Sequence, residues 1–442
     1  MLAGPVPEHL PGEPVRTGAS PAGIAVRVLF ATPALALLFT ATAGLWPLYL
    51  VSVLVWGWPP NVPRSSQVAR YLHLAFTATP PAPGLSWPAR AWIASSVLQK
   101  VAIMPVAGLA WQLDELLYGR ALRDTPVVAP LLEISAGRSG STQIARYLEG
   151  DPHLAAPGLI YAMFPYLWLW KLAPATVGRF ITRAQVTHRI EALMPPEFLQ
   201  RHEGDPFLTD TFDGPFYMGR LNGLAGALGP DVLVDDFGFA SNAPHAATLW
   251  EEDFVAFLDR VGRKTLVHAG PGPDGKPRRL FVKGHFLRAA DALARRYPDA
   301  RFLTVIRDPA SRLQSAVNYM RANPHDPVLG PTPWAWWSAA LVRTETLYNA
   351  TERAWFSRPE GPRRCVVQFT DFLADLEGTM AKVYRECLDV PELPAHVPRA
   401  HPPRERTKYL LNRTLAQAGI DEAAFVAAQD AQLVSTPSGA PP

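Results

Sequence analysis

The feature that most constrains this chain is the segment 131–147, which reads LLEISAGRSGSTQIARY. Its apolar residues 131–134 predict a short buried strand, Gly137 interrupts the strand, and a helical pattern continues to Leu148. A strand that leads through a glycine-containing turn into a helix directs backbone N–H groups and the helix dipole toward one point. The segment therefore predicts an anion-binding loop in an α/β protein.

The spacing in this loop differs from that of nucleotide triphosphatases. The Walker pattern has four residues between its glycines and a following Lys-Ser or Lys-Thr. Here Gly137 and Gly140 are closer together, and the cation, Arg138, precedes Ser139. Two hydroxyl residues, at positions 141 and 142, follow the second glycine. The alternative interpretation is an ordinary strand-to-helix turn with a serine cap.

A second segment, RFLTVIRDPASRLQSAVNYM, follows about 170 residues later. Residues 302–306 predict another buried strand, and Arg307 stands at its carboxyl end, where open α/β sheets place ligands. Asp308 is suited to the N-cap of the next helix and Pro309 to its first turn. Ser315 lies two turns into that helix, so Arg307 and Ser315 can bind one phosphate. A surface salt bridge with a mid-helix serine is the alternative.

Together the two segments resemble the sulfotransferases that use 3′-phosphoadenosine 5′-phosphosulfate (PAPS). That family has a basic-Ser-Gly-hydroxyl-hydroxyl loop for the 5′-phosphosulfate, matched here from Arg138 to Thr142. It also has an Arg-Asp/Asn-Pro stretch with a later Arg and Ser for the 3′-phosphate, matched by Arg307, Arg312 and Ser315. The resemblance covers roughly residues 128–412 and is nearest to the diverse bacterial and eukaryotic branch. It implies that the donor is bound by Gly137, Arg138, Ser139, Gly140, Ser141, Thr142, Arg307 and Ser315.

The candidate catalytic residues come from a third segment, 279–286, which reads RLFVKGHF and predicts a short strand. The compact cytosolic branch of the family has a Lys-x-His here, with its lysine near the sulfuryl group and its histidine as base. The resemblance implies Arg138, Lys283 and His285 as catalytic residues. Many members of the diverse branch carry a proline in place of the histidine. Alternative candidates for the base are Asp235, Asp236 and His245.

The late part of the chain extends the resemblance. Residues 364–377, RCVVQFTDFLADLE, resemble the family's late strand and the turn that follows it. Arg404, Arg406 and Lys408 follow a proline-rich stretch, where the family often closes a basic loop over the 3′-phosphate. A solvated tail is the alternative interpretation of these three residues.

Short apolar strands that alternate with helical stretches predict the fold class. We expect an α/β protein with a three-layer parallel sheet flanked by helices, in the P-loop nucleotide-hydrolase-like arrangement of sulfotransferases, preceded by an N-terminal hydrophobic helical region. One sheet is expected to contain the strands 131–135, 280–283, 302–306 and 366–369.

Composition excludes several function classes. The net charge of the 442-residue chain is only +3 and its basic residues are dispersed, which gives no reason to expect nucleic-acid binding. Cys365 and Cys387 lie on separate predicted elements and define no disulfide framework. No His, Cys and Asp cluster has zinc spacing and no Asp-rich calcium loop occurs in the sequence, so no metal is expected.

The amino-terminal part has a different character. Residues 1–23 are rich in Pro, Gly and Ala and predict a disordered tail. Residues 24–60 are expected to be a transmembrane or membrane-inserted segment, because no charge occurs between Val28 and Trp58. One tilted span is the simplest interpretation. A kinked insertion that does not cross, interrupted at Gly44, and a buried core helix are the alternatives.

The remaining boundaries follow from composition. We expect a helical linker region at 61–127, with helices in 89–122 broken at Pro105, then the sulfotransferase domain at 128–412 and a C-terminal tail at 413–442. Residues 154–170 are uncharged and aromatic, which predicts an element that contacts a membrane or covers the acceptor, or else core packing. The acidic run 251–253 predicts a solvated helix start.

The predicted function is transfer of a sulfuryl group from PAPS to a hydroxyl, or an amine, of a lipid, a glycan or a hydrophobic small molecule at a membrane. The basic residues on the two sides of the apolar segment do not choose its orientation. One alternative is a P-loop kinase-like phosphotransferase, which the missing Walker lysine disfavours. The other is a catalytically silent membrane protein with a nucleotide fold, which the presence of Arg138, Lys283 and Arg307 disfavours.

Overall fold

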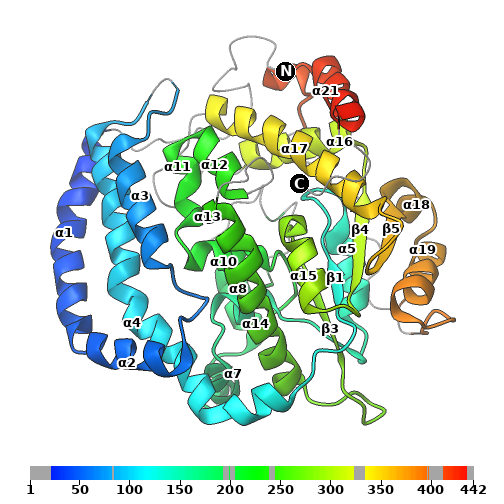
Figure 1. The fold of residues 1–442 in the computed structure, drawn as a ribbon, viewed down its shortest axis with the longest axis horizontal. Coiled ribbons are helices and arrows are strands. Elements are labelled where there is room, and N and C mark those ends of the chain that lie inside the picture. Colours follow the sequence, from blue (N-terminus) through cyan, green and yellow to red (C-terminus); the bar gives the residue numbers. More distant parts are fainter. Residues whose placement is uncertain are drawn as a thin grey trace.

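The computed structural model describes residues 21–81, 84–192, 205–237, 244–322, 334–395 and 412–435, together with residues 199 and 397. Most of the predicted tail 1–23 and the predicted basic loop with Arg404, Arg406 and Lys408 lie outside the described residues. Figure 1 shows two parts, with the amino-terminal helices side by side on one side of the molecule and a sheet on the other.

A five-stranded sheet has the order β2-β3-β1-β4-β5, and all neighbouring strands are parallel. Its strands are β1 (Leu131–Glu133), β2 (Leu154–Ala155), β3 (Arg279–Lys283), β4 (Arg301–Ile306) and β5 (Arg363–Gln368). The predicted fold class, a parallel sheet flanked by helices, is confirmed, and the four predicted strands share this sheet. The sequence did not predict β2, and β5 ends before Phe369, which begins a helix.

Successive side chains along each strand point to opposite faces of the sheet, and helices pack on both faces to give three layers. Leu131 and Leu132 are neighbours in β1, yet they belong to two different buried clusters, because successive strand residues point to opposite faces. The cluster around Leu132 packs against α14 (Phe254–Ala269), α15 (Ala290–Arg296) and α17 (Trp334–Phe356). The cluster around Leu131 packs against α5 (Ser141–Glu149), α18 (Phe369–Ala374) and α19 (Leu376–Val383). Helices therefore cover both faces of the sheet.

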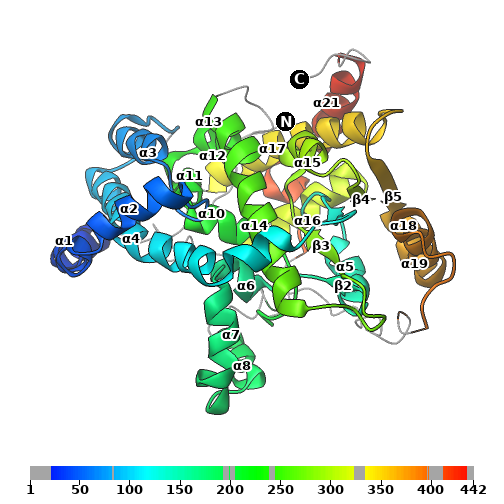
Figure 2. The same ribbon diagram turned by 60° about the horizontal axis from the view of Figure 1, so that its bottom comes forward.

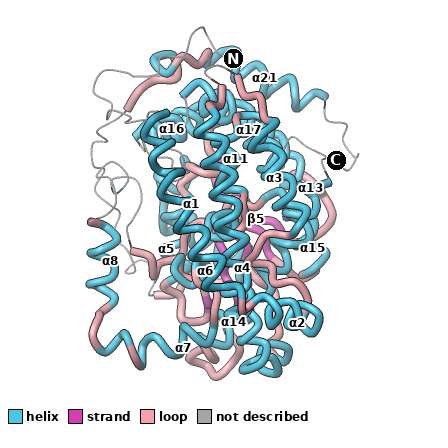
Figure 3. The backbone as a smooth tube through the Cα atoms, turned by 90° about the vertical axis from the view of Figure 1, so that its left-hand side faces the viewer, coloured by secondary structure: helices cyan, strands magenta, loops and turns pink. Residues whose placement is uncertain are grey.

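The amino-terminal helices are α1 (Pro21–Ala43), α2 (Trp46–Trp56), α3 (Ser65–Thr77) and α4 (Trp87–Asp124). The predicted tilted span is two helices, since the apolar part of α1 and α2 meet at an angle of 61°. Helix α1 packs along α4, as Figures 1 and 3 show, with the strands behind the helices in Figure 3. By length and hydropathy, α4 could cross a membrane among the described residues, and residues 31–43 of α1 together with α2 pass the same test as one bent pair, either a broken span or a re-entrant loop.

The predicted break at Pro105 is wrong, because α4 runs through it without interruption. An interior proline removes one backbone hydrogen bond and disfavours a helix. Helix α4 tolerates it because it packs against α1, α2, α3, α7 and α14 along its length. Tertiary packing here outweighs the local cost.

Three further segments show how the structure decides what the sequence left open or did not predict. Residues 154–170 form β2, α6 (Leu159–Met163) and the start of α7 (Leu167–Ala175), and Leu167 and Trp170 lie in the core. The run 251–253 belongs to a π-helical turn, η3 (Thr248–Asp253), in which Asp253 is buried against Arg220. Cys365 and Cys387 form a disulfide.

Shorter elements complete the chain, and Figure 2 shows α7 and α8 extending away from the body. Helix α21 packs against α16 and α17. The remaining helices are α8 (Arg183–Glu191), α10 (Asp213–Gly219), α11 (Ala225–Leu228), α12 (Pro230–Phe237), α13 (Pro244–Ala247), α16 (Pro309–Ala322), α21 (Glu422–Ser435) and the short turns η1 (Val177–Arg179), η2 (Asn222–Leu224), η4 (Leu287–Ala289), η5 (Tyr384–Leu388) and η6 (Ala416–Ala418).

A buried ion pair joins the amino-terminal helices to the sheet layer. Asp114 of α4 and Lys264 of α14 are both fully buried, with Oδ2 and Nζ 2.9 Å apart. The Asp114 carboxylate also accepts the N–H groups of Leu167 and Trp168, both at 2.8 Å, at the start of α7. Lys264 donates to the carbonyl of Pro165 and lies 3.4 Å from the ring centre of Trp111. One carboxylate therefore fixes three helices.

We predict that Asp114→Ala destabilises the protein by about 3 kcal/mol, because it leaves a buried ammonium and two N–H groups without an acceptor. Asp124→Ala on the same helix is the control. Asp124 forms only an exposed pair with Arg120, which contributes less than about 1 kcal/mol. The shift of the denaturant midpoint, followed by near-ultraviolet circular dichroism in detergent, measures both. Equal shifts for the two variants would contradict the prediction.

Candidate functional site

The predicted anion-binding loop connects β1 to α5 with a backbone that favours a ligand. Arg138 has φ of 64° and Gly140, the N-cap of α5, has φ of 94°. A Cβ at Gly140 would lie 2.5 Å from the ring of Phe369, so only glycine fits there. No side chain caps α5, and its first N–H groups therefore remain directed at whatever lies before the helix.

The loop also contains a buried polar atom that has no hydrogen-bond partner among the described residues. Ser139 is fully buried, and its Oγ has no hydrogen-bond partner among the described residues. A buried hydroxyl without a partner costs roughly 1–3 kcal/mol. An anion oxygen held by the α5 N-terminus would remove that cost, so the residues present fit an anionic group.

The first group of predicted site residues meets on one side of this loop. The guanidinium of Arg307 donates from Nη1 to the carbonyl of Arg138 at 3.1 Å, and it lies 4.7 Å from the ring centre of Phe369. Nε of Arg138 donates to Oγ of Ser315 at 3.2 Å. The Arg138 guanidinium also stacks on Tyr319, 5.2 Å from its ring centre. Two arginines and a hydroxyl, from two strand ends and α16, therefore lie together.

The second group lies at the end of β3. Lys283 is buried and donates from Nζ to Oδ1 of Asp210 at 2.9 Å. The backbone N–H of His285 donates to Oδ1 of Asp213 at 2.7 Å. His285 Nε2 would be 3.6 Å from a Cβ at Gly137, which places the imidazole against the first glycine of the loop. The loop therefore touches both groups of residues.

The contacts of His285 define which of its nitrogens carries the proton. Nδ1 lies 2.8 Å from the carbonyl oxygen of Ser135, which can only accept, so Nδ1 donates. Nε2 of the neutral ring then carries the lone pair, on the side that faces Gly137. Burial lowers the pKa of His285 below its usual value, although Asp213 acts in the opposite direction. The imidazole is therefore neutral at pH 7 and has an unprotonated Nε2.

A buried polar network supports this imidazole. Ser135 donates from its N–H to Oε1 of Glu133 at 3.0 Å, and its hydroxyl donates to the same oxygen. The Ser135 hydroxyl oxygen accepts the N–H of Val305 at 2.7 Å. Burial raises the pKa of Glu133 to about 7, against the attraction of Lys283. One serine thus links β1, β4 and His285.

Two of the alternative candidates for the base, Asp236 and His245, contact each other away from the loop. Asp236 is buried and accepts hydrogen bonds from Tyr71 and from Asn222, the latter at 2.8 Å. Arg70 lies 2.9 Å and His245 3.6 Å from its other oxygen. These contacts make Asp236 and His245 a structural cluster between α3 and α12, the helix that also carries Asp235.

The predicted motif residue Arg312 is also structural. Its buried guanidinium pairs with Glu345 at 2.8 Å and with Glu352 at 3.2 Å, both on α17. It therefore holds α16 in place beside Arg307. Sequence reasoning missed Asp210, Asp213 and Ser135, because no local pattern distinguishes these residues from others of their type.

Comparison with known proteins agrees with this arrangement. Residues 130–392, more than half of the chain, match the model of the Sulfotransferase family. The chain belongs to the sulfotransferase family. The matched range contains the anion-binding loop, the end of β3 and the start of α16. No curated protein sequence matches the chain.

Solved structures share the fold of this sulfotransferase. Sulfotransferase STF9 from Mycobacterium avium is 16% identical with a TM-score of 0.57, and the match covers 89% of this chain and 96% of that one. Sulfotransferase STF1 from Mycobacterium tuberculosis H37Rv is 18% identical with a TM-score of 0.51, over 87% of this chain and 98% of that one. At these identities the likeness establishes the fold.

Glu133 should give the sulfotransferase a measurable pH dependence of stability. Its pKa is about 7 in the folded protein against an ordinary 4.5, so its contribution is complete below pH 4.5 and is lost as pH rises through 7. We predict that the parent loses on the order of 3 kcal/mol of unfolding free energy across this window relative to Glu133→Gln. Denaturant titrations at several pH values measure it.

The control is Glu377→Gln, at an exposed carboxylate in the first turn of α19. This variant should keep the pH dependence of the parent. If Glu133→Gln also keeps it, the carboxyl of Glu133 is not the group that titrates.

Proposed function

We propose that this sulfotransferase transfers a sulfuryl group from PAPS to a hydroxyl, or an amine, of a lipid, a glycan or a hydrophobic small molecule at a membrane. The observation that carries the proposal is the meeting of Arg138, Arg307 and Ser315 with the α5 N-terminus, next to Lys283 and His285. Anion-binding groups and a neutral base at one edge of the sheet suit transfer of a charged group.

The donor would be held by residues of the first group and the loop. Arg307 and Ser315 would bind its 3′-phosphate end, and Arg138, which contacts both residues, would lie between that end and the phosphosulfate. The N–H groups and hydroxyls from Ser139 to Thr142 would bind the phosphosulfate at the start of α5. These contacts contribute binding and orientation.

The second group would carry out the transfer. When bound, the donor supplies a sulfuryl group whose bond to the 5′-phosphate oxygen breaks as the bond to the acceptor oxygen forms. His285 would take the acceptor proton at Nε2, and Nδ1 stays bonded to Ser135. Arg138, Lys283 and the loop N–H groups would stabilise the negative charge that develops on the departing oxygen. Asp210 would hold the Lys283 ammonium in place.

A small cavity supports an apolar acceptor. Its volume is about 110 Å³, and it lies between α4 and α10, with a lining that includes Ile103, Met104, Met163 and Phe216. Helix α10 begins at Asp213, the partner of the His285 N–H. A hydrophobic group bound there would therefore contact the same helix that holds the backbone of His285.

The proposed membrane location rests on the amino-terminal helices. Helix α4 is long and apolar enough to span a bilayer, and α2 exposes Leu48, Leu54 and Val55. We propose that residues 24–60 and 61–127 form the membrane-facing part and that residues 128–412 form the catalytic domain, with single-pass or monotopic attachment.

The function is tested by incubating the purified chain with sulfur-labelled PAPS and membrane extract. Labelled product soluble in organic solvent supports the proposal and identifies the acceptor. Transfer of label from the γ-phosphate of ATP, without transfer from PAPS, would favour a kinase instead.

We predict that Arg307→Ala weakens binding of adenosine 3′,5′-bisphosphate about 10- to 150-fold, because it removes a charge-assisted contact worth about 1.5–3 kcal/mol. Arg301→Ala is the matched control, since Arg301 begins the same strand and pairs with Asp389 at the other end. It should leave the affinity within about twofold. Calorimetric titration measures both, and unchanged affinity in Arg307→Ala would remove this residue from the donor site.

We predict that His285→Ala lowers kcat by roughly 10²–10⁴ with little change in donor affinity, because a positioned base contributes that much. His153→Ala is the control, since the carbonyl of His153 accepts from Arg279 at the opposite end of β3. Initial rates across pH measure both. A parent rate that falls with pH only well below 6.5, with the fall absent in His285→Ala, would match the lowered pKa.

A further inference from the structure

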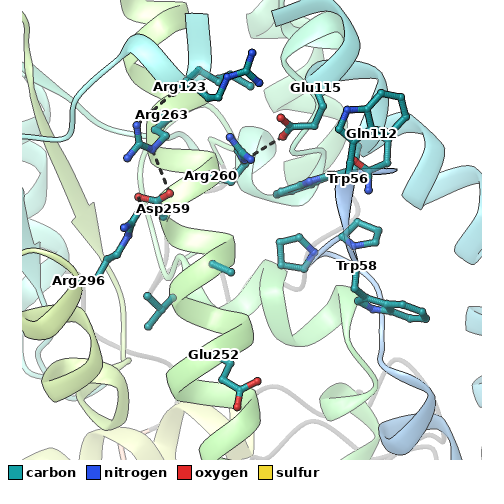
Figure 4. Close-up of a pocket in the computed structure, with 16 residues that line it drawn as sticks. Trp56, Trp58, Gln112, Glu115, Arg123, Glu252, Asp259, Arg260, Arg263 and Arg296 are labelled. Carbon is teal, nitrogen blue, oxygen red and sulfur yellow. Dashed lines mark hydrogen bonds and ion pairs between the residues drawn. The ribbon is translucent and has the colours of Figure 1, made fainter. Parts of the chain in front are cut away.

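A second, larger cavity lies away from the site described above. Its volume is about 580 Å³, which is within the range of small-ligand pockets. One wall is α14, whose residues 255, 256, 259, 260 and 263 recur at helical spacing, extended by residue 252 of η3. The opposite walls are α4 and the segment 56–60 that follows α2. Figure 4 shows arginines on the α14 side and Trp56 and Trp58 across from them.

The charge in this cavity favours an anion. Four arginines line it, namely Arg123, Arg260, Arg263 and Arg296. Its carboxylates compensate only part of this charge, since Glu115 pairs with Arg260 and Asp259 pairs with Arg263 and Arg296. The third, Glu252, pairs with Arg64 outside the cavity. Four positive charges against three negative ones leave an excess of one positive charge in the lining.

The cavity lies at the opposite end of the sheet from the donor residues. Nη1 of Arg263 donates to the carbonyl of Thr125 at 2.7 Å, in the segment that leads into the start of β1. Arg296 ends α15, shortly before β4 begins at Arg301. The length of β4, six residues at ~3.3 Å each, or about 20 Å, separates this end from Arg307. An anion bound here would therefore be distinct from the donor.

The two helices that contribute to the cavity also expose apolar side chains. Leu54 is 86% exposed on α2, the helix that ends at the cavity residue Trp56. Leu116 is 67% exposed on α4, the helix that carries the cavity residues Glu115 and Arg123. Helices that combine exposed leucines with tryptophan and arginine are typical of a membrane interface, where rings and basic groups lie at head-group depth.

We propose that this cavity binds the phosphate head group of an anionic membrane lipid while the exposed apolar residues of α2 and α4 enter the acyl layer. The inference shares the membrane location with the proposed function but does not depend on sulfuryl transfer. Its consequence is a fixed orientation, with the amino ends of the strands toward the bilayer.

The test measures binding of the full chain to vesicles without donor or acceptor. Phosphatidylcholine vesicles are compared with vesicles that contain phosphatidylglycerol. The parent should prefer the anionic vesicles, and the double variant Arg123→Gln/Arg296→Gln should bind them about 10- to 30-fold less tightly, at about 1 kcal/mol per arginine. Equal binding of the parent to both kinds of vesicle would overturn the proposal.

The matched control is Arg120→Gln/Arg295→Gln. It removes the same charge from the same two helices, at exposed arginines that pair with Asp124 and Glu251 and do not line the cavity. The affinity of the control variant for anionic vesicles should remain at least fivefold higher than that of the cavity variant, because charges outside the cavity are screened by solvent and salt. Equal losses would mean diffuse attraction to the surface and would overturn the proposal.

A third measurement distinguishes a lipid from a soluble anion. Inorganic phosphate and glycerol 1-phosphate are titrated into the parent and the cavity variant. Binding of these anions to the parent without a preference for anionic vesicles would assign the cavity to a soluble phosphate and overturn the lipid proposal. Sulfuryl transfer to a soluble acceptor by the cavity variant, at the parent's rate, would show that the two sites are independent.

Discussion

The position of β1 between β3 and β4 is the constraint on which the site depends. The N–H of Ile134 donates to Leu303 of β4 at 2.9 Å, and the N–H of Gly284 after β3 donates to Glu133 at 3.0 Å. Parallel pairing brings the three carboxyl ends to one edge, so the loop after β1 has the end of β3 on one side and Arg307 on the other. Without this strand order, the groups that fit donor binding and transfer would not share an edge.

Buried polar groups convert that strand order into a fixed geometry. Ser135 is tied to Glu133, to the backbone of β4 and to the ring of His285, so its position sets the tautomer of the imidazole. Each of these groups is desolvated, and removing any partner leaves another one unsatisfied at a cost of roughly 1–3 kcal/mol. Away from the site, Asp114 likewise fixes the geometry of buried elements, because its carboxylate links α4 to α7 and α14.

The two ends of the sheet have different chemistry. The carboxyl end carries the uncapped α5 and the arginines of the donor site, while the amino end carries the basic cavity between α4 and α14. Both ends favour anions, and the exposed leucines of α2 and α4 are on two helices that contribute to the cavity at the amino end. A bilayer at the amino end would leave the carboxyl end open to a soluble donor. The small cavity between α4 and α10 has a lining that includes Ile103, Met104 and Phe216 and could hold an apolar group.

The sequence by itself determined the four main strands, the loop from Gly137 to Thr142 and the approach of Arg138 to Arg307, because apolar runs, glycines and helix starts act over a few residues. The tertiary structure alone decided that Asp210 and Asp213 stand beside Lys283 and His285, about 70 residues away in the chain. It also decided that α4 continues through Pro105, that the apolar segment bends into α1 and α2, and that arginines from α4, α14 and α15 line one cavity. The physical reason is the distance along the chain over which each interaction acts. Backbone propensity and side-chain spacing are local properties, whereas buried ion pairs, cavities and helix packing depend on which distant segments the folded chain brings together.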